Sequence, residues 1–236
     1  AIIWPAMLLA YGDLNLPTNV PANQYILIKG EKASASRGVG KTLNDYLDEW
    51  NPDSLRYALA SILPEQNDSE ISEDEMIRRN NEELVAAWGN LVQRVFSQYI
   101  NNFEKLDFDF ELNEIDKKII DEASVCFEKT GELIEKVELK SSLQSVMGYV
   151  NKINAYLNET EPWKIIKEDN ARATAILHTS LTAIDACASL FTPFMPTTSE
   201  VVKNAIEKNT NNNWSVNDIK KGAPLKNIGH LFKKFD

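Results

Sequence analysis

The chain has 236 residues, of which 43% are hydrophobic and 25% are charged, as in a globular protein with one large domain or one domain with smaller appendages. Its net charge of −10 argues against non-specific nucleic-acid binding, although a local cationic face can still contact phosphates. No apolar run approaches the roughly 20 residues that span a bilayer, so we expect no membrane segment.

The cysteine and histidine content limits metal and redox chemistry. Cys126 and Cys187 lie far apart within helical patterns, which indicates a reducing, cytoplasmic compartment rather than a disulfide framework. Without a CxxC pair the chain has no zinc knuckle, and we expect no metal site. His178 and His230 are isolated, so they are interpreted as structural or surface residues, and no Ser/His/Asp triad can be assembled.

The first 40 residues predict the end of a helix followed by an extended, loop-rich segment. Residues 1–12 form an apolar helical pattern that ends at Gly12, without an initiator Met or a signal peptide, which suggests a piece of a longer chain. Residues 13–40 contain one clear strand, at 25–29, and are punctuated by prolines and glycines (Pro17, Pro21, Gly30, Gly38, Gly40).

The rest of the chain is predicted to be almost wholly helical. Residues 43–62 read as two short helices separated by Asn51-Pro52-Asp53. From Ser72 onward, apolar residues recur at helical spacing in four long stripes, and a short helix is expected at 198–208. Four or five such helices with short connections predict an antiparallel bundle. The residues expected to pack the tail onto another surface are Trp214, Leu225, Leu231, Phe232 and Phe235.

The first candidate site is the stretch Lys32-Ala33-Ser34-Ala35-Ser36-Arg37-Gly38. Small residues, two hydroxyls and flanking cations suit a loop that closes over phosphates, because compact side chains permit close backbone approach and Lys or Arg neutralises the anion. The same composition also fits an ordinary surface turn.

The second candidate site combines Asn90 and Arg94 with Trp163. Asn90 and Arg94 are four residues apart on one predicted helix, so they share a face. Asn suits a base edge, Arg suits a phosphate or base, and an exposed Trp163 after Pro162 can stack on an unpaired base. The alternative is that Asn90 and Arg94 lie on a solvated face and Trp163 packs into the end of the bundle.

A third candidate, the acidic stretch 64–70, is suited either to a cation or to a capped surface turn. We favour the turn, because Asn, Asp, Ser and Glu commonly cap helices and form turns.

Taken in order, these segments resemble methionyl-tRNA synthetase, a class I aminoacyl-tRNA synthetase. The segments that carry the resemblance are Ile3-Trp4-Pro5-Ala6-Met7-Leu8-Leu9, the loop Gly30–Gly38, Asp53-Ser54-Leu55-Arg56-Tyr57 with 64–70, Asn90-Leu91-Val92-Gln93-Arg94, Glu161-Pro162-Trp163 and Leu231-Phe232-Lys233-Lys234. The resemblance covers essentially the whole chain.

The resemblance implies a mainly α fold in four parts. Residues 1–12 would be the end of a Rossmann-like catalytic domain, and 13–71 the K-M-S-K-S-like loop with a small α/β stem-contact segment. Residues 72–208 would be the helical anticodon-binding domain, and 209–236 a tail that packs back on the body.

The resemblance also implies a function. The intact enzyme would activate methionine with ATP and Mg and transfer it to methionine tRNA, and this chain would recognise the CAU anticodon. Lys32, with Ser34, Ser36 and Arg37 in support, would handle ATP. Asn90, Arg94 and Trp163 would bind the anticodon, with Trp163 stacked on its first base.

Two departures from the family pattern leave alternatives open. Ala33 and Ala35 stand where the family has Met and Lys, and the upstream nucleotide motif and methionine pocket are not in these residues, so the chain alone is expected to be inactive. The alternatives are a related class I synthetase of the Leu, Ile, Val or Cys type, and a non-catalytic tRNA-binding or assembly module.

Overall fold

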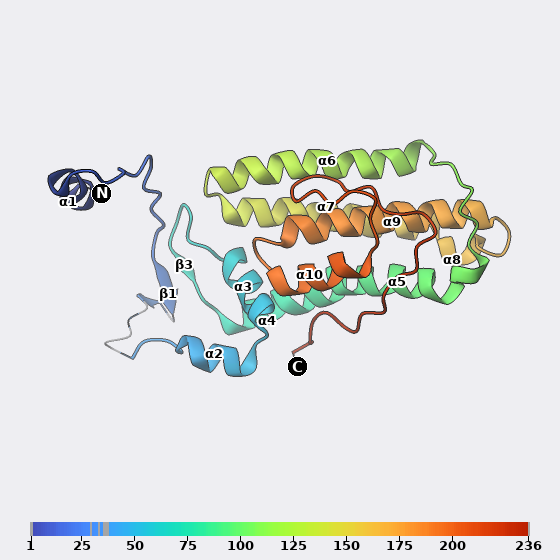
Figure 1. The fold of residues 1–236 in the computed structure, drawn as a ribbon. Coiled ribbons are helices and arrows are strands. Elements are labelled where there is room, and N and C mark those ends of the chain that lie inside the picture. Colours follow the sequence, from blue (N-terminus) through green and yellow to red (C-terminus); the bar gives the residue numbers. More distant parts are fainter. Residues whose placement is uncertain (1, 29, 33, 35–37, 236) are drawn as a thin grey trace.

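The computed structural model describes residues 2–235 apart from 29, 33 and 35–37, and places a helical body next to a small sheet and an N-terminal arm (Figure 1). The arm is helix α1 (Ile3–Tyr11), which ends at Gly12 with a φ of 79°, as its apolar pattern predicts. None of its residues is buried, and it lies apart from the body (Figure 1).

A three-stranded sheet follows the arm. Strands β1 (Ile26–Ile28) and β2 (Glu31–Lys32) are antiparallel, with Leu27 opposite Lys32, and β3 (Ser69–Glu70) pairs in parallel on the other side of β1. The acidic stretch 64–70 therefore supplies a strand. Two of its carboxylates accept backbone N–H groups, Asp68 from Tyr25 and Glu65 from Lys140, in agreement with the structural interpretation of this stretch.

Two short helices connect the sheet to the bundle. Helix α2 (Leu43–Glu49) begins with a capping box between Thr42 and Asp45. Helix α3 (Pro52–Ser61) has the Asn51 side chain as its cap and Pro52 in its first turn. The predicted break at 51–53 is confirmed, and its cause is this cap.

One continuous helical rod runs from Glu73 to Asn102, but its hydrogen bonding changes along its length. It consists of α4 (Glu73–Arg79), a ten-residue π-helix η2 (Asn80–Gly89) and α5 (Asn90–Asn102), and a 3₁₀ turn η3 (Phe103–Lys105) follows. Its predicted apolar stripe is buried, with Leu84 and Trp88 at 0% and 1% exposure. The π-helix was not predicted, because apolar residues at 84, 88, 91 and 95 also fit an ordinary α-helix.

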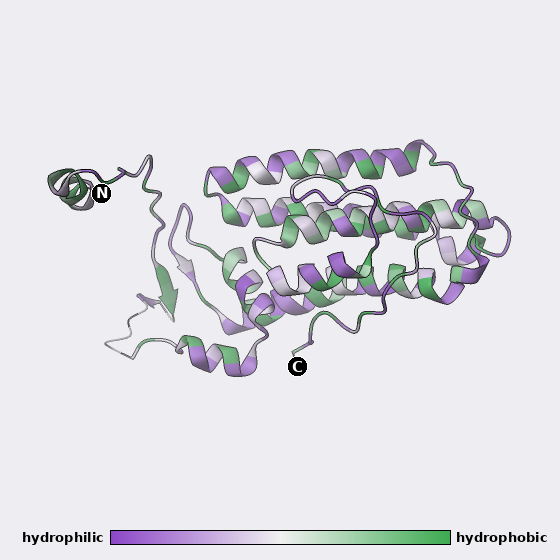
Figure 2. Ribbon diagram, viewed as in Figure 1, coloured by the Kyte–Doolittle hydropathy of each residue, from purple (hydrophilic) through white to green (hydrophobic). Residues whose placement is uncertain are grey.

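The bundle is completed by α6 (Glu114–Glu135), α7 (Leu139–Thr160), the short α8 (Pro162–Ile165), α9 (Asn170–Phe191) and α10 (Pro196–Ala205). Helix α6 alternates hydrophilic and hydrophobic residues, as an amphipathic outer helix does (Figure 2). Helix α9 contacts α5, α6, α7, α8 and α10, and it is buried on all sides. The antiparallel bundle is thus confirmed.

Helix α9 is both long and deeply buried. By length and composition it could cross a membrane, although no uninterrupted apolar run of that length exists. In the fold, 94% of its most apolar window is buried against the other helices, which is the position of a core helix.

Two side chains of α3 join the small helices to the bundle. Asp53 Oδ2 accepts hydrogen bonds from the N–H of Thr198 (2.6 Å) and from its hydroxyl (2.9 Å), so it caps α10 from outside. Arg56 donates to the carbonyl oxygens of Pro193 and Phe194, both at 2.8 Å, beyond the end of α9. Side chains three residues apart on α3 therefore fix both ends of the α9–α10 corner.

The C-terminal tail packs against the small helices at one end and against α6 at the other. The ring of Phe235 lies 4.3 Å from that of Trp50, and its backbone exchanges hydrogen bonds with the Asn81 side chain. At its other end Trp214 packs edge-on against Phe127 of α6 at 5.5 Å. The tail thus packs onto the body through Trp214 and Phe235.

We predict that Asp53→Ala lowers the free energy of unfolding by about 1–3 kcal/mol, because it leaves the buried Thr198 N–H without its acceptor. Urea denaturation measures this change. The matched control is Asp45→Ala, which removes an exposed cap, and we expect a smaller loss of about 0.5 kcal/mol. Equal losses would contradict the special role of Asp53 at the corner.

His178 lies on α9, with its ring 5.1 Å from that of Phe110. Burial, assisted by the nearby Lys221 charge, lowers the pKa of His178 to about 4. The folded state is therefore more stable with a neutral His178 than with a protonated one.

Because this pKa is lower in the folded state, His178 stabilises the fold fully above pH 6.5 and ceases to do so as the pH falls toward 4. The loss reaches at most about 3 kcal/mol. Urea denaturation at several pH values should show it in the unmodified chain and not in His178→Gln. Parallel pH profiles of the two proteins would refute the assignment.

Candidate nucleic-acid interface

The predicted phosphate loop begins on strand β2. Lys32 is exposed, and its Nζ lies 3.5 Å from the centre of the Tyr25 ring. Ser34 pairs with Val39 through two backbone hydrogen bonds. Ser36 and Arg37, with Ala33 and Ala35, lie outside the described residues.

A cation at the base of this loop links it to two helices. Lys41 Nζ lies 2.5 Å from Glu73 of α4 and 3.1 Å from Glu49 of α2. The hydrogen bonds that Lys41 donates to Glu73 and Glu49 raise the pKa of Lys41, so it stays charged. Lys41 also lines a groove of about 650 Å³ with Glu31, Asp74 and other residues. The ion pairs hold the outgoing end of the loop against the helices.

Asn90 and Arg94 are both exposed on α5, as their spacing predicts. The Arg94 guanidinium donates to Oδ1 of Asn154 at 2.6 Å and to Oδ1 of Asn158 at 3.2 Å, both on α7. Asn154 in turn donates to the carbonyl oxygen of Ala87 at 3.2 Å. The two hydrogen bonds to Asn154 and Asn158 use two of the five N–H donors of the guanidinium and hold it in place.

Asn154 and Asn158 were missed as site residues in the sequence. They are four residues apart on the third apolar stripe helix, which is the same spacing as Asn90 and Arg94 on α5. The only indication in the sequence was that Asn154 and Asn158 have the same spacing as Asn90 and Arg94, on a second amphipathic helix. Their pairing across the bundle depends on how α5 and α7 are aligned, which the sequence does not give.

Trp163 lies at the start of α8, directly after the buried Pro162, and it is 37% exposed. Glu161 before it adopts the left-handed conformation, with φ 41° and ψ 57°. The indole is thus presented at a sharp corner just beyond the last turns of α7, the helix that holds Arg94. Trp163 therefore lies outside the bundle core, and its role as a stacking platform, rather than as packing at the end of the bundle, stays a prediction.

The loop and this cluster lie at opposite ends of the molecule. Strand β2 belongs to the small sheet beside the arm, whereas α8 is at the far end of the bundle (Figure 1). The structure therefore brings Arg94 together with α7, and separates α8 from Lys32. An amide, a guanidinium and a partly exposed indole suit an unpaired nucleotide chemically.

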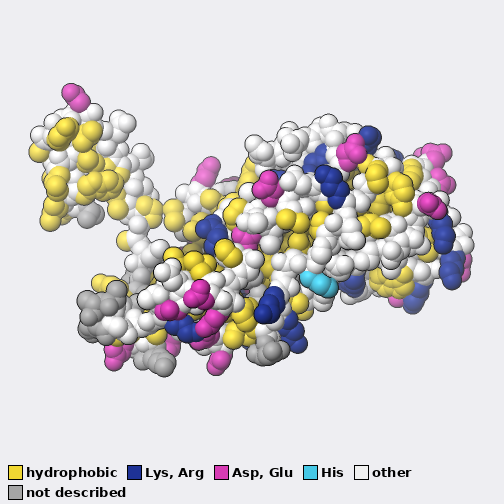
Figure 3. All heavy atoms as spheres, turned by 60° about the horizontal axis from the view of Figure 1, so that its bottom comes forward, with side chains coloured by type: hydrophobic (Ala, Val, Ile, Leu, Met, Phe, Trp, Pro, Cys, Tyr) yellow, Lys and Arg dark blue, Asp and Glu magenta, His cyan; other side chains and the backbone are white. Residues whose placement is uncertain are grey.

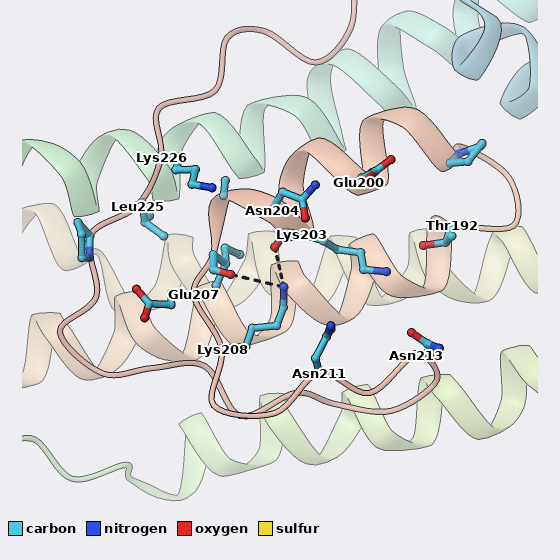
Figure 4. A pocket seen from close by; sticks show the side chains of 14 residues that line it. Thr192, Glu200, Lys203, Asn204, Glu207, Lys208, Asn211, Asn213, Leu225 and Lys226 are labelled. Atoms are coloured by element: carbon cyan, nitrogen blue, oxygen red, sulfur yellow. Dashed lines mark hydrogen bonds between the residues drawn. The ribbon is translucent and has the colours of Figure 1, made fainter.

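Elsewhere, a groove of about 850 Å³ lies between α10 and the tail (Figure 4). Its Lys208 donates to the carbonyl oxygens of Lys203 (2.6 Å) and Ile206 (3.5 Å) and pairs with the buried Asp185 at 2.9 Å. The Lys208 ammonium group therefore stabilises the fold by joining the end of α10 to α9. Lys and Arg side chains are interspersed with Asp and Glu over the face seen in Figure 3, while hydrophobic side chains cover α1.

Two family models match the chain. The model for class I tRNA synthetases, "tRNA synthetases class I (M)", matches residues 1–96, which places the chain among the class I synthetases. The model "Anticodon binding domain of methionyl tRNA ligase" matches residues 109–236, more than half of the chain. The chain belongs to the methionyl-tRNA ligase family.

Individual relatives agree with this identification. The methionine–tRNA ligase of Chloroflexus aggregans is 38% identical over 215 residues, which are 84% of this chain and 36% of that protein. That of Thermomicrobium roseum is 40% identical over 202 residues, 85% of this chain and 35% of that protein. The chain thus spans about a third of the length of the curated relatives it matches.

Solved structures share the fold. The Mycobacterium tuberculosis methionyl-tRNA synthetase in complex with methionyl-adenylate has a TM-score of 0.85 at 22% identity, over 97% of this chain and 46% of that one. The apo form of the same enzyme has a TM-score of 0.84 at 20% identity, over 99% of this chain and 47% of that one. The prediction of this family and of its helical fold is confirmed.

The contact between Arg94 and Asn154 yields a stability prediction. In a double-mutant cycle with Arg94→Ala and Asn154→Ala, we expect a coupling energy of about 0.5–1 kcal/mol in urea denaturation. The control cycle pairs Arg94→Ala with Gln93→Ala, whose effects should add because neighbouring residues on a helix do not face each other. Additivity in both cycles would exclude an energetic link between α5 and α7 at this point.

Proposed function

We propose that this chain is the tRNA-recognition part of a methionine–tRNA ligase and that the α8 end of its bundle reads the CAU anticodon. The observation that carries the proposal is the 37% exposed Trp163 at a fixed corner, in a segment that matches the methionyl anticodon-binding family. A base stacked on an aromatic ring contributes about 1–3 kcal/mol of binding, and contacts to the base edge supply the discrimination between bases.

In this proposal Trp163 stacks on the first anticodon base, and Asn90 and Arg94 contact anticodon bases and backbone. The amide of Asn90 offers a donor and an acceptor to a base edge. Arg94 is supported by Asn154 and Asn158, so less conformational freedom is lost when it engages a phosphate or a base.

In the intact ligase we propose that the loop from Lys32, with Ser34, Ser36 and Arg37, closes over the phosphates of ATP. Its cations would stabilise the charge that develops when methionine is activated, and Mg would accompany the nucleotide. Support comes from the M. tuberculosis relative, whose structure contains methionyl-adenylate. Ala35 supplies no cation to this loop.

We also propose the division into four parts, at 1–12, 13–71, 72–208 and 209–236. The exposed apolar surface of α1 supports assigning it to a catalytic domain, because Ile3, Met7 and Leu9 are 76%, 65% and 66% exposed and suit burial against other protein. Such an enzyme would act in the cytoplasm, in keeping with two free cysteines.

The test of anticodon reading is tRNA binding by the 236-residue chain. We predict that Trp163→Ala weakens binding of methionine tRNA by roughly 5- to 150-fold, and that it hardly affects a transcript whose first anticodon base is changed from C to A. The matched control is Trp214→Ala, since Trp214 is similarly exposed, at 40%, but packs on α6. Equal affinity of the unmodified chain for both transcripts would refute the proposal.

A second candidate function is a non-catalytic tRNA-binding or assembly module, which Ala35 favours. ATP–pyrophosphate exchange by the full-length protein separates the two functions. Exchange by the unmodified protein supports the ligase. Exchange that appears only in Ala35→Lys indicates a binding module with a disabled loop. The match of residues 109–236 to the methionyl family weighs against a Leu, Ile, Val or Cys enzyme.

A further inference from the structure

A wholly buried carboxylate lies at the start of α6, at the same end of the bundle as α8 (Figure 1). Asp116 Oδ1 accepts hydrogen bonds from the Tyr156 hydroxyl at 2.5 Å and from Nη2 of Arg172 at 2.9 Å. Its Oδ2 accepts from Nη1 of Arg172 and from the Asn113 N–H at 3.0 Å. Both oxygens of Asp116 are therefore satisfied by side chains from α7 and α9 and by the N-cap of its own helix.

The two side-chain donors flank the segment that carries Trp163. Tyr156 lies in the last turns of α7, and Arg172 lies in the first turn of α9. Residues 157–171, including α8, connect them. Asp116 therefore closes this segment into a ring by holding both of its ends through one carboxylate.

Within that ring, two further hydrogen bonds reinforce the end of α7 and the start of α9. The Thr160 hydroxyl donates to the Tyr156 carbonyl at 2.7 Å, and the Asp169 side chain accepts from the Arg172 N–H at 2.8 Å. Glu161, the residue between α7 and Pro162, has a φ of 41°, which is unfavourable for a residue with a side chain. Such a conformation persists only where the surroundings fix it, and the ring supplies that constraint.

The interaction is poorly explained as a device for stability alone. Burying an ion pair costs desolvation energy, and apolar residues often stabilise a core equally well. What a buried carboxylate with a bidentate Arg adds is a fixed geometry between three helices. Burial favours the neutral acid, but the hydrogen bonds from Arg172 and Tyr156 hold the pKa of Asp116 below its usual range, so the pair stays ionised.

We propose that Asp116, Tyr156 and Arg172 are positioning residues for Trp163: they hold the corner at Glu161–Trp163 so that the indole is presented to the first anticodon base. The inference rests on the proposed function, in which Trp163 is the stacking platform. It adds three residues, none of which touches the RNA, to those that determine first-base discrimination.

The experiment uses Tyr156→Phe and Arg172→Lys in the 236-residue chain, because both retain bulk, and Arg172→Lys also retains charge. Binding of methionine tRNA and of the transcript with A as first anticodon base gives the discrimination ratio. We expect each variant to lower this ratio at least 5-fold while affinity for the changed transcript stays within 2-fold. In protein labelled with 5-fluorotryptophan, the ¹⁹F resonance of Trp163 should shift or broaden, whereas those of Trp50 and Trp88 should not.

The matched control is Asp185→Asn, which alters another buried ion pair of α9. Asp185 pairs with Lys208 at 2.9 Å and accepts from Asn217 at 2.7 Å, at the tail rather than at α8. This variant should lose stability and leave both the discrimination ratio and the Trp163 resonance unchanged. A loss of discrimination in Asp185→Asn equal to that in Tyr156→Phe would overturn the inference, because general destabilisation would then explain both.

The outcomes separate this inference from the proposed function. If the unmodified chain does not discriminate between the transcripts, the proposed function fails and the inference fails with it. If Trp163→Ala abolishes discrimination but Tyr156→Phe and Arg172→Lys retain it with an unshifted Trp163 resonance, only the positioning inference is overturned.

Discussion

The burial of α9 is the constraint on which the rest of the structure depends. This helix is buried around its whole circumference, and five other helices cover it. Its ends are then fixed by charged groups: Arg172 binds Asp116 of α6 near the first turn, and Arg56 of α3 binds the carbonyl groups just beyond the last turn. The hydrophobic effect sets the position of α9, and these polar contacts set the directions of the helices joined to it.

This arrangement gives the chain two ends with different properties. Around α8, hydrogen bonds through Asp116 join α6, α7 and α9, and the indole of Trp163 is partly exposed. Around the small sheet, the strands are two or three residues long, and the loop after Lys32 is fixed mainly where Lys41 pairs with Glu49 and Glu73.

The helices could be predicted from the sequence because each apolar stripe has helical spacing and several breaks coincide with a cap or a proline, as at Asn51-Pro52. The exposure of Asn90 and Arg94 followed in the same way. The partners of Arg94 did not, because Asn154 and Asn158 lie about 60 residues further along, and their meeting depends on helix alignment. The π-helix also escaped prediction, since hydrogen-bond register leaves no mark in hydrophobic spacing over ten residues.

The π-helix also restricts how many residues can lie between α4 and α5. Each residue of a π-helix turns through a smaller angle than a residue of an α-helix, so η2 works as a spacer that sets where α5 starts its rotation. Removing one residue between Asn80 and Gly89 would let the rod revert to α-helical winding and turn Asn90 and Arg94 away from α7. Substitutions within η2 are therefore easier to accommodate than insertions or deletions. Relatives that keep the contact of Arg94 with α7 should also keep the number of residues between α4 and α5.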